Sequence, residues 1–153
     1  GQVLNAAIIK NEHFHFPSKA KTVIMISNGT GIAPFLGMLD EYNKGRNIHL
    51  YCGFRNHASF KLYEDALSTD MEKLSKLKVA YSREDEKLYV KDVLARDADF
   101  VAETLKKSGA VMLCGSLAMQ KDVLEWLEIV CEQAGDKSLS FYQSRGQVLM
   151  DCY

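Results

Sequence analysis

The sequence has no excess of positive charge: 19 Lys and Arg residues stand against 20 Asp and Glu residues, for a formal net charge of -1. A balanced chain has no overall positive field to hold nucleic acid or an anionic membrane, so any anion site must be local. It also lacks an apolar run near the roughly 20 residues that cross a bilayer, and a basic start followed by an apolar signal core. We therefore expect no nucleic-acid partner and no membrane segment in this chain.

Cysteine is scarce and scattered. The four cysteines form no CxxC pair and no dense disulfide framework; they are Cys52, Cys114, Cys131 and Cys152. Isolated cysteines of this kind favour reduced thiols and a cytoplasmic location, either of the chain itself or as the cytoplasmic part of a larger, membrane-linked protein. The four histidines show no metal-ligand spacing, so we expect no metal site.

The length of 153 residues and the hydrophobic content of 47% suffice for one well-buried core. The chain begins with Gly1 instead of Met, which suggests a processed product or a piece of a longer protein. We expect one domain over residues 21–153. Residues 1–20 are less regular and are expected to form a lead-in segment from a missing domain.

Apolar β-rich runs alternate with amphipathic segments along the domain. The runs lie at residues 22–27, 48–54, 77–82, 110–114 and 147–152, and the helical patterns at about 33–44, 60–74, 90–107 and 116–134. The first, second and fourth runs are almost continuously hydrophobic, as strands buried on both faces require. The alternation predicts an α/β fold: a three-layer sandwich with a five-stranded parallel sheet.

Ligands of such sheets bind outside the carboxyl ends of the strands, and a glycine-rich loop follows the first predicted strand. Gly29, Thr30 and Gly31 stand there, and Pro34 suits the first turn of the next helix. A helix N-terminus reached through such a loop binds phosphate with its free N–H groups and its positive dipole end. A tight structural turn is the alternative, but the strand-to-helix context favours a phosphate site.

The ends of the second and third strands carry cations. Arg55 follows the second strand, where an NAD-binding fingerprint would place an acid; it is suited to a diphosphate, although an exposed loop arginine is an equal alternative. The third strand runs into a polar segment containing Ser82, Arg83, Lys87, Tyr89 and Lys91. This segment could bind an adenosine 2′-phosphate. Three acids at positions 84–86 leave a solvated, charged loop as the alternative.

The fourth strand ends at Cys114, which places a thiol at the same sheet edge as the glycine-rich loop. A buried core cysteine is the default interpretation. No His or Asn follows at a spacing that would suggest a cysteine nucleophile.

Taken together, these motifs resemble the pyridine-nucleotide domain of the ferredoxin-NADP reductase superfamily, and in particular the sulfite reductase flavoprotein and related diflavin reductases. The resemblance covers residues from about 11 to 153 and rests on motifs in the family's order: Asn28-Gly-Thr-Gly-Ile-Ala-Pro-Phe35, Gly53-Phe-Arg55, Ser82-Arg83 with Lys87 and Tyr89, Cys114-Gly115, and the terminal Asp151-Cys-Tyr153. It implies a Rossmann-like nucleotide-binding domain of the ferredoxin reductase type. It also implies NADP(H) as a cofactor, and FAD held mainly by a domain absent from this chain.

The resemblance assigns a role to each residue in these motifs. It implies that Gly29, Thr30, Gly31 and Arg55 hold the diphosphate, that Ser82, Arg83 and Lys87 bind the 2′-phosphate, and that Tyr89 stacks on the adenine. Lys91 stands where many relatives have a glutamine near the adenosine end. In the catalytic part, Cys114 is expected beside the nicotinamide, Asp151 to arrange Cys114, and Tyr153 to stack on the flavin.

These implications predict an oxidoreductase domain that moves hydride from NADPH to FAD on a neighbouring domain of the same parent chain, with an unknown downstream acceptor. Alone, the domain should not hold FAD tightly or turn over. Two alternatives stay open: a non-catalytic nucleotide-binding module, and an NADH-using relative. An ordinary NAD dehydrogenase is disfavoured, because Arg55 stands where its acid should be.

Overall fold

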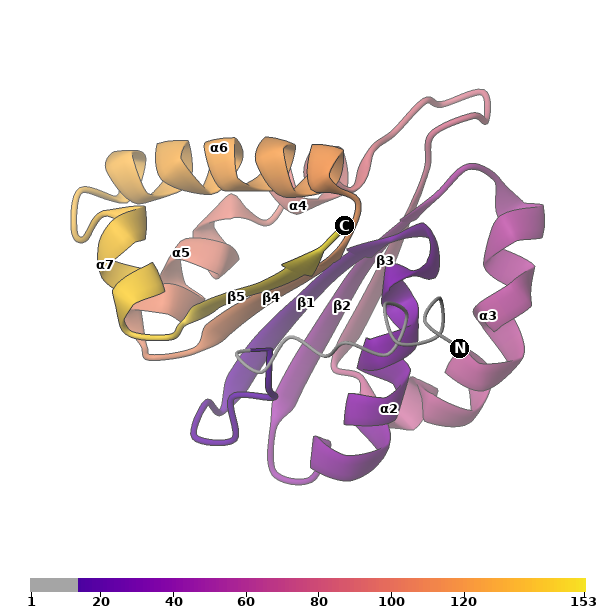
Figure 1. Cartoon of the computed structure of the whole chain (residues 1–153), viewed down its shortest axis with the longest axis horizontal. Helices are drawn as coiled ribbons and strands as arrows, with labels where there is room; N and C mark the ends of the chain where they lie inside the picture. The colour runs from indigo at the N-terminus through magenta and orange to yellow at the C-terminus, as the bar shows by residue number, and fades with distance from the viewer. Residues whose placement is uncertain (1–13) are drawn as a thin grey trace, which may run out of the picture.

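Five parallel strands form one sheet through the middle of the fold (Figure 1). The computed structural model describes residues 14–153, apart from the side chains of residues 69–71. The strands are β1 (Thr22–Asn28), β2 (Asn47–Phe54), β3 (Lys76–Tyr81), β4 (Ala110–Gly115) and β5 (Val148–Cys152), in the order β3-β2-β1-β4-β5 across the sheet. The predicted five-stranded parallel sheet is confirmed, and each predicted run agrees with its strand to within one residue at either end.

Helices cover both faces of the sheet, as the three-layer prediction requires (Figure 1). One face carries α2 (Ile32–Tyr42) and α3 (His57–Asp70); the other carries α4 (Val90–Ala95), α5 (Ala98–Lys106), α6 (Leu117–Ala134) and α7 (Leu139–Ser144). Two 3-10 turns, η1 (Gly29–Gly31) and η2 (Met71–Lys73), complete the described elements. Side chains of β1 alternate between the two layers: Val23 and Met25 pack with α2, whereas Ile24 and Ile26 face α4 to α6.

The helix predicted at residues 90–107 is in fact two helices, α4 and α5. Asp97 separates them in a non-helical conformation, with φ -118° and ψ 30°. Its carboxylate accepts hydrogen bonds from Tyr51 Oη at 2.7 Å and Lys76 Nζ at 3.3 Å, and pairs with Lys78 Nζ at 2.9 Å. Burial by itself would raise the pKa of Asp97, but these contacts outweigh it and lower the pKa to about 2. The single-helix prediction was wrong because partners on β2 and β3 hold Asp97 out of the helix.

Part of the predicted lead-in segment packs onto the domain. Residues 1–13 lie outside the described part of the chain, but Phe14 and Phe16 are buried in the core beside α2. The ring of Phe16 stacks on Tyr42, with centroids 4.4 Å apart and planes 2° from parallel. The guanidinium of Arg46 lies 5.3 Å from the Phe16 ring centroid. These contacts fix the start of the described chain against the C-terminal end of α2.

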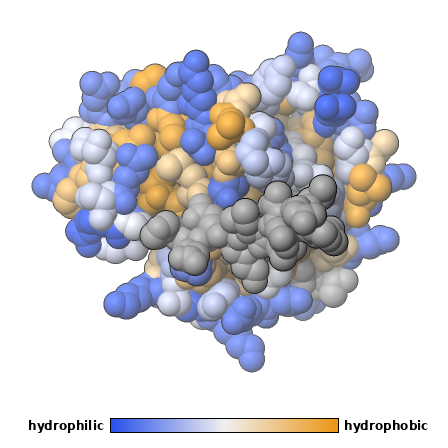
Figure 2. All heavy atoms as spheres, in the orientation of Figure 1, coloured by the Kyte–Doolittle hydropathy of each residue, from blue (hydrophilic) through white to orange (hydrophobic). Residues whose placement is uncertain are grey.

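β5 is an edge strand whose residues after Val148 are only partly buried. In Figure 2, hydrophobic residues gather along this strand beneath α6, while hydrophilic residues cover most of the surrounding surface. Of the helices in the described part of the chain, none combines the length and apolarity needed to cross a bilayer.

Candidate functional site

A cleft of about 610 Å³ opens at the carboxyl ends of the strands. It lies where β1 stands between β2 and β4, which is the point where the strand order reverses and a crevice forms in folds of this kind. Of the residues that the sequence predicts as cofactor ligands or catalytic groups, the cleft is lined by Gly29, Thr30, Arg55, Ser82, Tyr89, Lys91 and Tyr153. Loops that are far apart in sequence therefore converge on one site.

The glycine-rich loop is pressed against the end of β4. Gly29 has φ 54°, a left-handed conformation that glycine adopts without strain. A Cβ built on Gly31 would lie 2.1 Å from the carbonyl oxygen of Cys114 and 2.8 Å from Cα of Gly115. The 3-10 turn η1 then leads directly into α2, so Gly29 and Thr30, which line the cleft, stand just before the N-terminus of a helix.

A pair of polar side chains joins this loop to the start of α6. Asn28 Oδ1 accepts a hydrogen bond from the Ser116 N–H at 2.8 Å, and Asn28 Nδ2 donates to Ser116 Oγ at 3.0 Å. Ser116 Oγ also accepts from the Met119 N–H at 3.1 Å, which caps α6. Sequence analysis did not assign Asn28 or Ser116 a role. A serine directly before a helical pattern is an N-cap indication, but its partner Asn28 is 88 positions away.

Four of the predicted cofactor ligands are cations on the segments that follow β2 and β3. Arg55 and Lys91 line the cleft, and the backbone N–H of Arg83 donates to the carbonyl of Arg55 at 2.8 Å, so the two loops run side by side. Arg83 and Lys87 are exposed in the loop that carries Ser82, although they do not line the cleft itself. Within the described part of the chain, no carboxylate pairs with any of these four cations. They are available to an anionic ligand.

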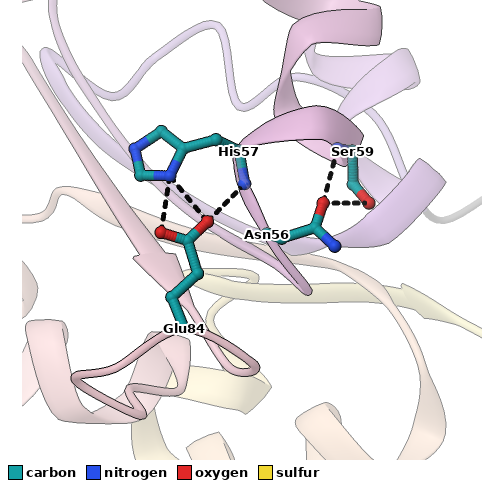
Figure 3. A network of polar contacts seen from close by, with 4 residues as sticks. All are labelled: Asn56, His57, Ser59 and Glu84. Carbon is teal, nitrogen blue, oxygen red and sulfur yellow. Dashed lines mark hydrogen bonds and ion pairs between the residues drawn. The ribbon is translucent and has the colours of Figure 1, made fainter.

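Figure 3 shows that backbone N–H groups in the first turn of α3 donate hydrogen bonds to side chains of the protein itself. Glu84 Oε2 accepts from the backbone N–H of His57 at 2.5 Å, and His57 Nδ1 lies 2.6 Å from each oxygen of that carboxylate. Asn56 Oδ1 accepts from the N–H of Ser59 at 3.0 Å. The His57 ring stacks on Tyr81, with centroids 3.9 Å apart. Neither Glu84 nor His57 was among the predicted site residues.

Cys114 and Asp151 are register partners on β4 and β5, so the structure places these two predicted catalytic residues side by side. Cys114 is only 1% exposed, and neither residue lines the cleft. Burial, and secondarily the charge of Asp151, raise the pKa of the Cys114 thiol to about 12. The thiol is therefore neutral at physiological pH and is not a nucleophile in this state.

Tyr153 reaches back over the glycine-rich loop. Its hydroxyl lies 2.8 Å from Thr30 Oγ1, its N–H donates to the carbonyl of Gly115 at 2.9 Å, and its carbonyl accepts from the Leu117 N–H at 3.2 Å. The residue is nevertheless 68% exposed. An aromatic ring held by its backbone but open to solvent is available for stacking at the mouth of the cleft.

No group of three or more His, Cys, Asp or Glu side chains in the described part of the chain is arranged to hold a metal ion. The cations, backbone N–H groups and aromatic rings of the cleft instead suit an organic, phosphorylated ligand.

Comparison with known proteins identifies the family of the chain. Residues 25–125 match the family model of the oxidoreductase NAD-binding domain. The NADPH–cytochrome P450 reductase of Oryctolagus cuniculus is 35% identical over 146 residues, covering 86% of this chain and 22% of the relative. That of Salmo trutta is 34% identical over 140 residues, covering 83% and 23%. The chain thus spans less than a quarter of the length of these relatives. It belongs to the oxidoreductase NAD-binding domain family, within the ferredoxin-NADP reductase superfamily that its motifs resemble.

Proposed function

We propose that this chain is the NADP(H)-binding domain of a flavoprotein oxidoreductase and delivers hydride from NADPH to FAD held on another domain of the same parent chain. One observation carries the proposal: a glycine-rich loop and two cations, Arg55 and Lys91, line one cleft, and Arg83 and Lys87 lie on the loop beside it, with no carboxylate partner for these cations in the described part of the chain. A dinucleotide with an additional 2′-phosphate matches this arrangement. The names of the relatives specify NADPH as their donor, which supports the same assignment.

The residues of the cleft fit this cofactor in size and charge. The proposed diphosphate ligands are the N–H groups of Gly29, Thr30 and Gly31 and the side chain of Arg55. Gly29, Thr30 and Arg55 line the cleft, and Gly31 holds the loop so close to β4 that a side chain there has no room. For the 2′-phosphate, the proposed ligands are the hydroxyl and cations of the segment after β3: Ser82, Arg83, Lys87 and Lys91. Tyr89, which is 52% exposed, is available to stack on the adenine.

The catalytic end is proposed from the register of β4 and β5. When bound, the nicotinamide and flavin supply the hydride transfer between them. Cys114 provides a neutral thiol beneath that position, and Asp151 fixes it from the adjacent strand. Tyr153 shields the flavin face and must leave its bond with Thr30 when the nicotinamide enters.

The FAD-binding domain is proposed to precede the lead-in segment of residues 1–20, and the downstream electron acceptor is outside this chain. We place the domain in the cytoplasm because its four thiols are all unpaired.

Calorimetric titration with 2′,5′-ADP and with ADP tests the nucleotide assignment. Two charge-assisted hydrogen bonds to the 2′-phosphate, at about 1.5–3 kcal/mol each, predict a preference on the order of 10²-fold or more. Arg83→Ala should remove roughly 10-fold of the affinity for 2′,5′-ADP and little for ADP. Lys107→Ala, which removes an exposed cation at the end of α5, is the matched control. Equal binding of the two ligands by the unmodified chain would contradict an NADP-type site.

A further inference from the structure

The loop proposed to bind the 2′-phosphate also carries acidic side chains that can compete with the phosphate for its cations. Three acids, Glu84, Asp85 and Glu86, stand directly between Arg83 and Lys87. A carboxylate in such a loop can pair with the neighbouring guanidinium or ammonium group and so compete with a phosphate for it. The position of these acids therefore bears on how well the loop discriminates between nucleotides.

The structure directs Glu84 away from those cations. Its carboxylate crosses to the start of α3, where both oxygens lie 2.6 Å from Nδ1 of His57 and one accepts from the His57 N–H (Figure 3). A carboxylate only accepts hydrogen bonds, so Nδ1 is the donor. The ring is itself held by stacking on Tyr81 at 3.9 Å. Glu86 is also turned outward, 3.8 Å from Arg96.

Arg83 and Lys87 are left without a carboxylate partner in the described part of the chain, although three acids separate them. The backbone of Arg83 is meanwhile fixed by its hydrogen bond to the carbonyl of Arg55. Two of the three acids have other partners: Glu84 is bound to His57, and Glu86 lies near Arg96.

We propose that His57 is a positioning residue for nucleotide selectivity: it sequesters the Glu84 carboxylate and so keeps Arg83 and Lys87 open to the 2′-phosphate. This inference rests on the proposed function, because it concerns the same nucleotide site. His57 acts through Glu84 and is not itself a ligand of the nucleotide. A merely structural role would instead make His57 matter equally for every nucleotide.

The test compares His57→Ala, Glu84→Gln and the double variant by calorimetric titration with 2′,5′-ADP and ADP. The His57 side chain is 67% exposed, so its removal should leave the fold intact. His57→Ala frees Glu84 and should weaken 2′,5′-ADP binding by about three- to fivefold, the range of an exposed ion pair, with ADP unchanged. In the double variant the released side chain has no charge, so the affinity for 2′,5′-ADP should return to that of the unmodified chain.

Glu86→Gln is the matched control, because it removes a carboxylate of the same loop that is bound to Arg96. When Glu86→Gln is added to His57→Ala, the ratio of the affinities for 2′,5′-ADP and ADP should stay as it is in His57→Ala alone. An unchanged ratio in His57→Ala, or a double variant as weak as His57→Ala, would overturn the inference. Failure of the proposed function can be distinguished from failure of this inference, because the unmodified chain would then bind 2′,5′-ADP and ADP equally.

Discussion

Replacing Gly31 by alanine should dislodge the phosphate loop. The added Cβ would lie 2.1 Å from the Cys114 carbonyl oxygen and 2.5 Å from its carbonyl carbon, both of them backbone atoms of β4. Ordinary contacts are about 3.5 Å, so the loop must withdraw from β4 by roughly 1.0–1.4 Å. β4 cannot yield in its place, because it is fully buried and hydrogen-bonded between β1 and β5.

Overpacking of this kind typically costs about 1–3 kcal/mol. For a chain of this size, that corresponds to a fall in Tm of roughly 2–12 °C, which calorimetry or urea unfolding can measure. Nucleotide affinity should fall more than the loss of stability suggests, because the loop N–H groups proposed to bind the diphosphate move away from it. Titration with ADP isolates that loss, since ADP carries the diphosphate and lacks the 2′-phosphate.

Gly37→Ala is the matched control. Gly37 is exposed within α2, and a Cβ there would meet nothing within 4 Å. An alanine in a helix interior should therefore stabilise the chain by about 0.5–1 kcal/mol and leave ADP binding unchanged. If Gly31→Ala matched Gly37→Ala in stability and binding, the loop would not be fixed by its contact with β4, and the reasoning would be wrong.

Three further perturbations test other parts of the structure. Asp97→Asn should destabilise the chain by about 2 kcal/mol at pH 7, and the unfolding free energy of the variant should fall less steeply as the pH is lowered. The pKa of Asp97 is about 2 in the folded chain and about 4 in the unfolded chain, so the carboxylate stabilises the fold fully above pH 4 and loses this effect as the pH falls toward 2. Asn28→Ala breaks both bonds to Ser116 and should lower the unfolding free energy by about 1–2 kcal/mol; an unchanged urea midpoint would refute this. Tyr153→Phe keeps the ring but frees the Thr30 hydroxyl, so NADP⁺ affinity should rise severalfold by calorimetry; equal affinity would mean that Thr30 does not contact the diphosphate.

The sheet could be predicted from sequence because its determinants are local. Each strand is a continuous or alternating apolar run, and parallel strands covered on both faces require such runs. The glycine-rich loop could be predicted for the same reason, because the end of a strand, two glycines and the start of a helix lie within a few consecutive residues. Once five such runs are placed in parallel, their carboxyl ends meet at one edge, so the residues that follow them converge.

The features that sequence analysis missed depend on partners that only the fold brings together. The break at Asp97 is set by Tyr51, 46 positions earlier, and helical periodicity alone continues through it. Glu84 and His57 lie 27 positions apart, and either one alone reads as an ordinary surface residue. α7 has six residues, too short a segment to establish a helical period.

The proposed diphosphate loop and the proposed 2′-phosphate segment are built differently, and this difference should separate affinity from selectivity. The loop proposed to bind the diphosphate is backbone pressed against a buried strand, so a change there should disturb the fold, as the close contact of Gly31 with β4 indicates. The proposed 2′-phosphate segment carries exposed cations beside one imidazole–carboxylate pair, His57 and Glu84. A single exposed substitution can therefore alter which nucleotide is preferred while leaving the sheet and phosphate loop intact. Variation among related domains in the segments after β2 and β3 should accordingly follow cofactor preference, whereas the loop after β1 should tolerate little change in any of them.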